Sequence, residues 1–302
     1  EVMLAARVMQ GFGAAGPRII SMAVIRDLYS GREMARIMSF VMMVFTLAPA
    51  VGPLIGTGLI AVSGWRAIYL AFMCFSLITL FWLSFRLPET LPPEKRRAFQ
   101  PRVLLAASKE LFSYRSVRIS IVCQAMMSGL LIAMLSMVHS LYDVTFDRAA
   151  SFLFFFGLIS LFAGSASLLN ANIVMRFGMQ NVVVVSFGAQ VIFSAIMLGL
   201  SQNPPADGLY FALFLGWQTT VFFLTGLTIG NLNALAMEPV GHIAGLAASV
   251  LGGLSMICGT LLAIPVGLMF AGTPAPLAAA GVCFCSVATA LLLWLRHTQK
   301  QE

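Results

Sequence analysis

Long charge-poor stretches recur along the chain, separated by breaks rich in charged residues, glycine or proline. Each stretch has about the length that an α-helix needs to cross a bilayer, roughly 20 residues at about 1.5 Å of rise per residue. They are too long for core strands, which usually run about 3–10 residues. The pattern predicts nine membrane-spanning helices, over residues 2–25, 37–63, 67–85, 117–141, 149–173, 180–200, 208–235, 243–270 and 275–295.

The last two predicted helices share one long apolar run, so their boundary depends on helix-breaking residues. Gly272, Pro274 and Pro276 lie close together in this run. Proline lacks the backbone N–H that a helix interior needs, and glycine favours turns. We therefore divide the run at these three residues.

Composition supports a polytopic all-α membrane protein. Hydrophobic residues make up 60% of the chain and charged residues 10%, whereas a soluble domain has about 25% charged residues. We expect no metal, no cofactor and no enzymatic activity, because an intramembrane enzyme needs His, Asp, Glu or Cys clustered at facing depths. The cysteines instead lie singly or near one another inside apolar runs, without the polar flanks of metal or redox sites: Cys74, Cys123, Cys258, Cys283 and Cys285.

Positive charge concentrates in the connection between the third and fourth predicted helices. Eight Lys and Arg residues lie from Arg86 to Arg118, which marks this connection as cytoplasmic by the positive-inside rule. If the helices alternate from there, 14 basic residues lie inside, only Arg66 and Arg148 lie outside, and the C-terminus is cytoplasmic. Topology therefore explains the net charge of +7 without nucleic acid, for which the chain has no soluble basic face.

Two motifs carry a family resemblance. The first predicted helix contains Arg7-Val-Met-Gln10-Gly11-Phe-Gly13-Ala14-Ala15, which resembles the fourth-helix motif of drug–proton antiporters of the major facilitator superfamily. The second contains Ala48-Pro49-Ala50-Val51-Gly52-Pro53-Leu54-Ile55-Gly56-Thr57-Gly58, which resembles the fifth-helix antiporter motif, although Ala48 and Thr57 replace two of its glycines.

Further segments narrow the resemblance to the Bcr/CflA drug-resistance type. Arg26-Asp27-Leu28-Tyr29-Ser30, Arg36 and Gly64-Trp65-Arg66 are similar to that subfamily, and so are residues 233–238 and 245–249. The family has two six-helix halves joined by a cytoplasmic loop. The resemblance implies a major facilitator fold in which this chain is helices four to twelve of a twelve-helix bundle. Residues 1–86 would be the second part of the N-terminal half, 87–116 the loop, and 117–302 the C-terminal half with a short tail; three helices would precede Glu1.

The resemblance also implies a function. It predicts a monomeric exporter in the bacterial cytoplasmic (inner) membrane that exchanges protons for drugs or other small amphipathic compounds by alternating access. Its partners would be small-molecule substrates, protons and the lipid bilayer. The implied sites are Arg7 and Gln10 for proton coupling; Gly11, Gly13, Pro49, Gly52, Pro53 and Gly56 for the antiporter motif and the seal between halves; and Arg26, Asp27 and Arg36 in a cytoplasmic loop.

No acidic residue lies deep inside a predicted helix, so we expect the proton-carrying carboxylate upstream of Glu1, where the family often has one in its first helix. Without upstream helices, we expect that the chain by itself does not pump. A non-transporting remnant or assembly partner is therefore the alternative reading, and a membrane-embedded enzyme is the remotest one.

Arginines inside the bilayer indicate where the first helix faces protein or water. Arg7 and Arg18 are 11 residues apart, which places them within roughly 20° of each other on a helix. A charged residue at the bilayer centre costs at least about 2.5–3.5 kcal/mol, so this face should turn toward a bundle interior or cavity. Structural bonding to carbonyls, or snorkelling of Arg18 to the cytoplasm, are the alternatives.

Polar, methionine and tryptophan residues inside several of the predicted helices are candidates for substrate contact. Adaptable methionine and aromatic surfaces suit varied ligands, although the same residues could make interhelical hydrogen bonds. The candidates are Arg18, Gln124, Met127, Ser128, Trp217 and Gln218. Four asparagines near cytoplasmic helix ends are expected to cap helices there: Asn170, Asn172, Asn231 and Asn233.

Overall fold

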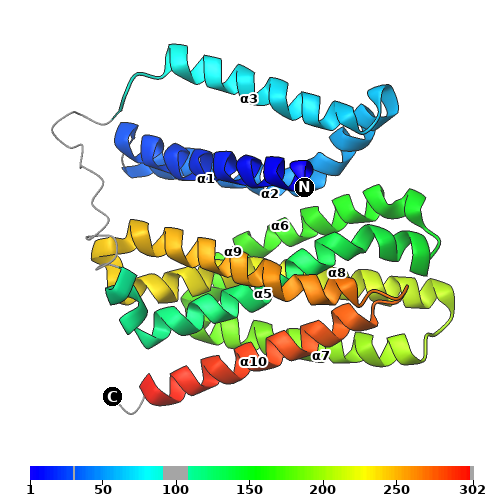
Figure 1. The fold of residues 1–302 in the computed structure, drawn as a ribbon. Helices are drawn as coiled ribbons and strands as arrows, with labels where there is room; N and C mark the ends of the chain where they lie inside the picture. Colours follow the sequence, from blue (N-terminus) through cyan, green and yellow to red (C-terminus); the bar gives the residue numbers. More distant parts are fainter. Residues whose placement is uncertain (30, 91–107, 300–302) are drawn as a thin grey trace. The chain divides into compact units, whose positions relative to one another are not determined.

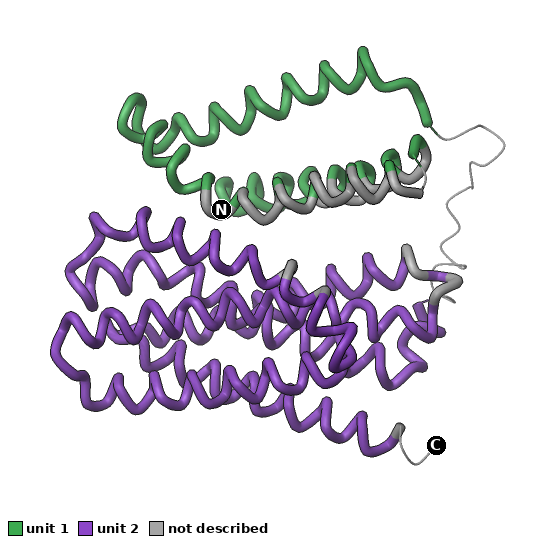
Figure 2. The backbone as a smooth tube through the Cα atoms, turned by 180° about the vertical axis from the view of Figure 1, so that it is seen from behind, with its two compact units in different colours: residues 1–99 green, residues 100–302 purple. Residues whose placement is uncertain are grey.

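The computed structural model describes residues 1–29, 31–90 and 108–299, with only the backbone described at some helical positions. Over these residues the chain is helical, with no strand. It divides into two compact units, residues 1–99 (unit 1) and residues 100–302 (unit 2), which Figure 2 draws in two colours.

The described residues of unit 1 form three helices, α1 (Val2–Leu28), α2 (Gly31–Ser63) and α3 (Arg66–Arg86). Helix α2 packs against both α1 and α3. Gly64 makes the sharp turn between α2 and α3 with a φ of 71°, a conformation that glycine adopts at little steric cost. No described residue of α3 is buried.

Between residues 108 and 299, unit 2 is a bundle of six long helices: α5 (Arg115–Ser140), α6 (Phe152–Phe177), α7 (Met179–Gln202), α8 (Asp207–Met237), α9 (Ala244–Leu268) and α10 (Ala275–Gln299). Helix α5 packs against α8, α9 and α10, while α7 packs against α8 and α10 (Figure 1). Helix α6 packs against α8. The main hydrophobic core lies between these helices and includes Met127, Phe187, Phe214 and Leu277.

The predicted division of the last apolar run is confirmed. Helix α9 ends at Leu268 and α10 begins at Ala275, with a turn between them in which Gly272 has a φ of 76°. Pro276 lies inside the first turn of α10 rather than in the turn before it. A proline is tolerated there because first-turn N–H groups have no partner inside the helix.

The helices have the length and surface of membrane spans. Among the described residues, seven helices are long and apolar enough to cross a bilayer, as expected of a multi-pass membrane protein. Large apolar side chains of α3 are exposed, including Phe75, Ile78 and Phe85. An apolar surface of this kind is stable against lipid and is rarely left open to water.

The prediction that four asparagines cap helices is wrong. Asn170 and Asn172 lie inside α6, and Asn231 and Asn233 lie inside α8. Asn231 donates from Nδ2 to Asn170 Oδ1 at 2.8 Å, which joins α8 to α6. Asn170 and Asn231 satisfy each other across the two helices, because an unpaired amide is costly in an apolar interior.

Candidate functional site

Arg7 is the centre of a polar cluster in unit 1. Helix α1 places Arg7 and Gln10 one turn apart, and Arg7 Nη1 donates to Gln10 Oε1 at 2.9 Å. Arg7 Nη2 donates to the hydroxyl of Tyr69, on α3, at 2.8 Å. The guanidinium carbon also lies 5.1 Å from the centre of the Tyr69 ring, within the range of a cation–π interaction. The two acceptors are neutral, so they orient the positive charge without cancelling it.

Tyr69 is held in turn by the start of α3. Trp65 meets the Tyr69 ring edge to face, with ring centres 5.9 Å apart. The Arg66 guanidinium lies 4.5 Å from the centre of the Trp65 ring. The sequence reasoning missed Tyr69, although Tyr69 follows Trp65 of the Gly64-Trp65-Arg66 segment by four residues. That spacing places both rings on one face of a helix.

The glycines of the two antiporter-like motifs lie open within unit 1. A Cβ atom added at Gly11, Gly13, Gly52 or Gly56 would meet nothing within 4 Å. Pro53 is half-buried beside them. These positions therefore offer small faces on α1 and α2 that a further helix could approach closely.

Five predicted site residues of unit 1 have only their backbone described. Arg18, Arg26 and Asp27 lie in α1, and Arg36 and Pro49 lie in α2. Their side chains are outside the described part of the chain, so the shared face of Arg7 and Arg18 stays a prediction.

The candidates on α5 of unit 2 lie inside the bundle. Gln124 donates from Nε2 to Asn233 Oδ1 on α8 at 2.9 Å, and Met127 is fully buried. Ser128 is half-buried, and its Cβ atom would lie 3.0 Å from a Cβ atom at Gly259 of α9. Gln124 and Ser128 thus lie against two different helices.

Trp217 and Gln218, on α8, belong to two separate sets of hydrogen-bonded side chains. Trp217 Nε1 donates to Ser194 Oγ at 3.1 Å, and the same oxygen accepts from Gln190 Nε2. Gln218 Oε1 accepts from the Tyr142 hydroxyl at 3.1 Å. Gln218 Nε2 is buried and has no partner among the described residues, so it is a donor that a ligand or water could satisfy.

The Tyr142 ring stands in an aromatic cluster at the end of α5. It lies in a short π-helical segment, Leu141–Thr145, and makes edge-to-face contacts with Phe152, Phe211 and Phe214. The ring that these aromatic side chains contact thus carries the hydroxyl that donates to Gln218. Substrate candidates on α5 and α8 are therefore parts of packed interhelical contacts in this structure.

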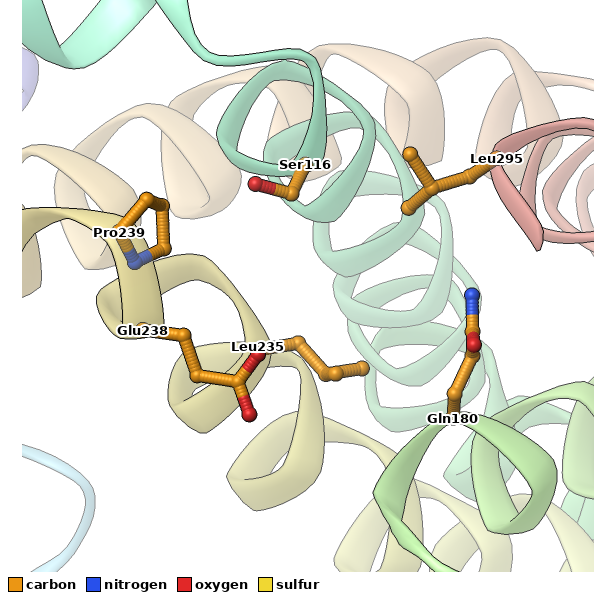
Figure 3. Close-up of a pocket in the computed structure, with 6 residues that line it drawn as sticks. All are labelled: Ser116, Gln180, Leu235, Glu238, Pro239 and Leu295. Carbon is orange, nitrogen blue, oxygen red and sulfur yellow. The ribbon is translucent and has the colours of Figure 1, made fainter. Parts of the chain in front are cut away.

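A pocket of about 340 Å³ opens at the other end of unit 2. Its lining residues, which Figure 3 labels, come from the first turns of α5 and α7, the end of α8 and the residues that follow it, and the last turns of α10. Its wall combines a carboxylate, a hydroxyl and an amide with apolar side chains: Ser116, Gln180, Leu235, Glu238, Pro239 and Leu295. Glu238 is exposed. This chemistry suits a ligand with a positive group and an apolar body.

Comparisons with known proteins agree on one family. A sequence model of the Major Facilitator Superfamily matches residues 2–263. The chain is 27% identical to the uncharacterized MFS-type transporter YdgK of Bacillus subtilis, over 88% of this chain and 66% of the relative. It is 27% identical to a bicyclomycin resistance protein homolog of Haemophilus influenzae, over 90% of this chain and 68% of the relative.

A third relative is multidrug resistance protein D of Escherichia coli, which is 26% identical over 87% of this chain and 64% of the relative. The chain spans about two thirds of the length of these curated relatives.

Proposed function

Because the chain belongs to the Major Facilitator Superfamily, we propose that it forms part of an exporter of drugs or other small amphipathic compounds. The exporter would move them out across the bacterial cytoplasmic membrane in exchange for protons. The names of two relatives, a bicyclomycin resistance protein homolog and a multidrug resistance protein, support this class of substrate. The observation that carries the coupling is the bonded cluster of Arg7, Gln10 and Tyr69 in unit 1.

Arg7 couples proton and substrate through its permanent charge. A guanidinium does not lose its proton at physiological pH, so Arg7 is not the proton carrier. A fixed positive charge instead disfavours a second positive charge close by, whether on a proton acceptor or on a cationic substrate. Arg7 would therefore favour the release of both a proton and a cationic substrate from sites close to it.

The proposed topology has the pocket end of unit 2 in the cytoplasm. Arg115, Arg118, Arg176 and Arg296 lie at or near the helix ends on that side, whereas Arg148 follows α5 at the opposite end. This asymmetry agrees with the positive-inside rule. Residues 1–86 would then be part of the N-terminal half, 87–116 the cytoplasmic connection, and 117–302 the C-terminal half with its C-terminus inside.

Alternating access needs a contact that seals and reopens. The glycine faces of α1 and α2 are open within unit 1, and small residues let helix backbones approach closely in membranes. We assign the seal to Gly52 and Gly56, with Pro53 as the residue that bends α2 between them.

The pocket at the proposed cytoplasmic end suits the first encounter with substrate. Glu238 offers a carboxylate to a cationic group, while Leu235 and Leu295 offer apolar contact. Compounds with a positive amine and an apolar body match both. We expect neutral compounds to depend less on this pocket.

The test is export by everted membrane vesicles from cells that express the gene encoding this chain. We expect uphill transport of amphipathic dyes and antibiotics that stops when a protonophore removes the proton gradient. Arg7→Lys should impair gradient-driven export, because one ammonium cannot bond two acceptors in the fixed geometry of the guanidinium fork. Export that is equally fast without a gradient contradicts proton exchange, and full gradient-driven export by Arg7→Ala contradicts the role of Arg7.

A further inference from the structure

The Arg7 side chain needs an anchor outside its own helix. Its bond to Gln10 joins residues three apart on α1, and pairs of that kind in a helix contribute less than thermal energy. Arginine also has several rotatable bonds, so such a pair does not confine the guanidinium to one place. A charge whose position decides coupling requires a further contact from another element.

Tyr69 provides that contact from α3. Its hydroxyl accepts from Arg7 Nη2 at 2.8 Å, and a hydrogen bond from a charged donor is stronger than a neutral one. The Tyr69 ring adds a cation–π contact at 5.1 Å. Gln10 and Tyr69 therefore bind two different nitrogens of one planar group, which defines its orientation.

Tyr69 is itself well suited to act as an anchor. A tyrosine has two side-chain torsions, so little conformational entropy is lost when it is ordered. Its ring packs edge to face on Trp65, and Arg66 covers Trp65. Arg66, Trp65 and Tyr69 thus form a chain of ring contacts at the start of α3 that ends at Arg7.

We propose that Tyr69 is the positioning residue of Arg7, and that its hydroxyl holds the guanidinium in the orientation used for proton coupling. This inference rests on the coupling role proposed above for Arg7. It adds a residue from α3 to a function that the sequence motifs place on α1 and α2 alone. It also makes the position of the charge depend on how α3 lies against α1 within unit 1.

The experiment compares wild type with four variants of the full protein in proteoliposomes, with ethidium as the transported cation. The variants are Tyr69→Phe, Arg7→Ala, the double variant and a control, Tyr29→Phe. Two rates are measured for each: export driven by an imposed proton gradient, and downhill efflux of preloaded ethidium without a gradient. Tyr29→Phe is the matched control, because it removes the same hydroxyl at the C-terminal end of α1, about 33 Å along the helix axis from Arg7.

We expect Tyr69→Phe to lower gradient-driven export roughly 10- to 150-fold, the effect of losing one hydrogen bond to a charged group. Downhill efflux and protein yield should stay near wild type. Adding Tyr69→Phe to Arg7→Ala should cause no further loss, because residues that act as one unit are not additive. Tyr29→Phe should match wild type in both rates.

Other outcomes overturn the inference in distinguishable ways. If Tyr69→Phe exports normally under a gradient while Arg7→Ala does not, Tyr69 has no role in coupling and Arg7 keeps its role. If Tyr69→Phe lowers gradient-driven export and downhill efflux equally, the hydroxyl has a structural role and no specific role in coupling. Normal export by Arg7→Ala, or no ethidium export by wild type, contradicts the proposed function and this inference with it.

Discussion

The crossing of α5 and α9 in unit 2 makes a sharp prediction about stability. Helices α5 and α9 meet at Gly129 and Gly259, where a Cβ atom added at Gly259 would lie 2.9 Å from the Gly129 backbone nitrogen. It would also lie 3.0 Å from the Ala125 carbonyl oxygen. Both obstacles are backbone atoms, so no side-chain rotation can relieve them. The substitution Gly259→Ala must push α5 and α9 apart.

The size of the effect follows from the distances. An ordinary carbon contact needs about 3.5–4.0 Å, and a gap of about 0.5–1 Å forfeits a quarter to a half of the dispersion energy of each contact. Overpacking of this kind typically costs about 1–3 kcal/mol. Against it stands the higher helix propensity of alanine, worth about 0.8–1.0 kcal/mol over glycine.

The variant Gly253→Ala separates the cost of overpacking from the gain in helix propensity. Gly253 also lies in α9, and an added Cβ atom there would meet nothing within 4 Å. Both variants gain the same helix propensity, so the difference between them is the packing cost alone. With roughly 2–4 °C per kcal/mol for a domain of about 150–250 residues, Gly259→Ala should unfold about 2–12 °C below Gly253→Ala.

The assay is thermal unfolding of the detergent-purified protein, followed by the reactivity of buried thiols. Cys123 and Cys285 are buried in the α5 and α10 core, so they become reactive as unit 2 opens. Unfolding of Gly259→Ala at the same temperature as Gly253→Ala, or above it, would contradict this prediction. That result would mean that α5 and α9 do not cross as closely as this.

Three further predictions address topology, the seal and the pocket. A cysteine introduced at position 95 in place of Lys95 should react only with reagents that reach the cytoplasm, and a cysteine in place of Asp143 should react only with reagents outside the cell. Labelling of both positions from outside would refute this topology. Gly56→Leu should leave protein yield unchanged, since a Cβ atom there meets nothing within 4 Å in unit 1. It should nevertheless block transport, because the larger side chain holds apart the helices of the seal. Unaltered export would count against the seal. Glu238→Gln should reduce export of cationic compounds several-fold and leave export of neutral compounds unchanged. Equal effects on both classes would mean that the pocket does not recognise the cationic group of the substrate.

Much of the helix layout could be predicted because the rule behind it is local. Backbone polar groups in a bilayer must bond within their own segment, so each long apolar run becomes a helix. The predicted ends lie within several residues of those observed, and the turn at Gly272 was found from its composition. Runs of apolar residues and their breaks are visible in any single sequence.

Partners between helices could not be predicted in the same way. Asn170 and Asn231 were assigned to caps from their nearness to helix ends, yet they bond to each other across α6 and α8. The sequence shows that Gln124 and Trp217 lie inside predicted helices, but it does not show that Asn233 and Ser194 are their hydrogen-bond partners. Which polar side chain meets which depends on the rotation and crossing of whole helices.

The sequence by itself determined that the chain is a set of long apolar helices, that its basic residues gather at alternate helix ends, and that Arg7 and Gln10 share a motif. Each of these follows from residue type and from spacings of a few residues, which local physics governs. Only the tertiary structure decided that Tyr69, 62 residues along the chain from Arg7, accepts its hydrogen bond. It likewise decided the close approach of Gly129 to Gly259, because contacts between distant residues arise from packing many side chains at once.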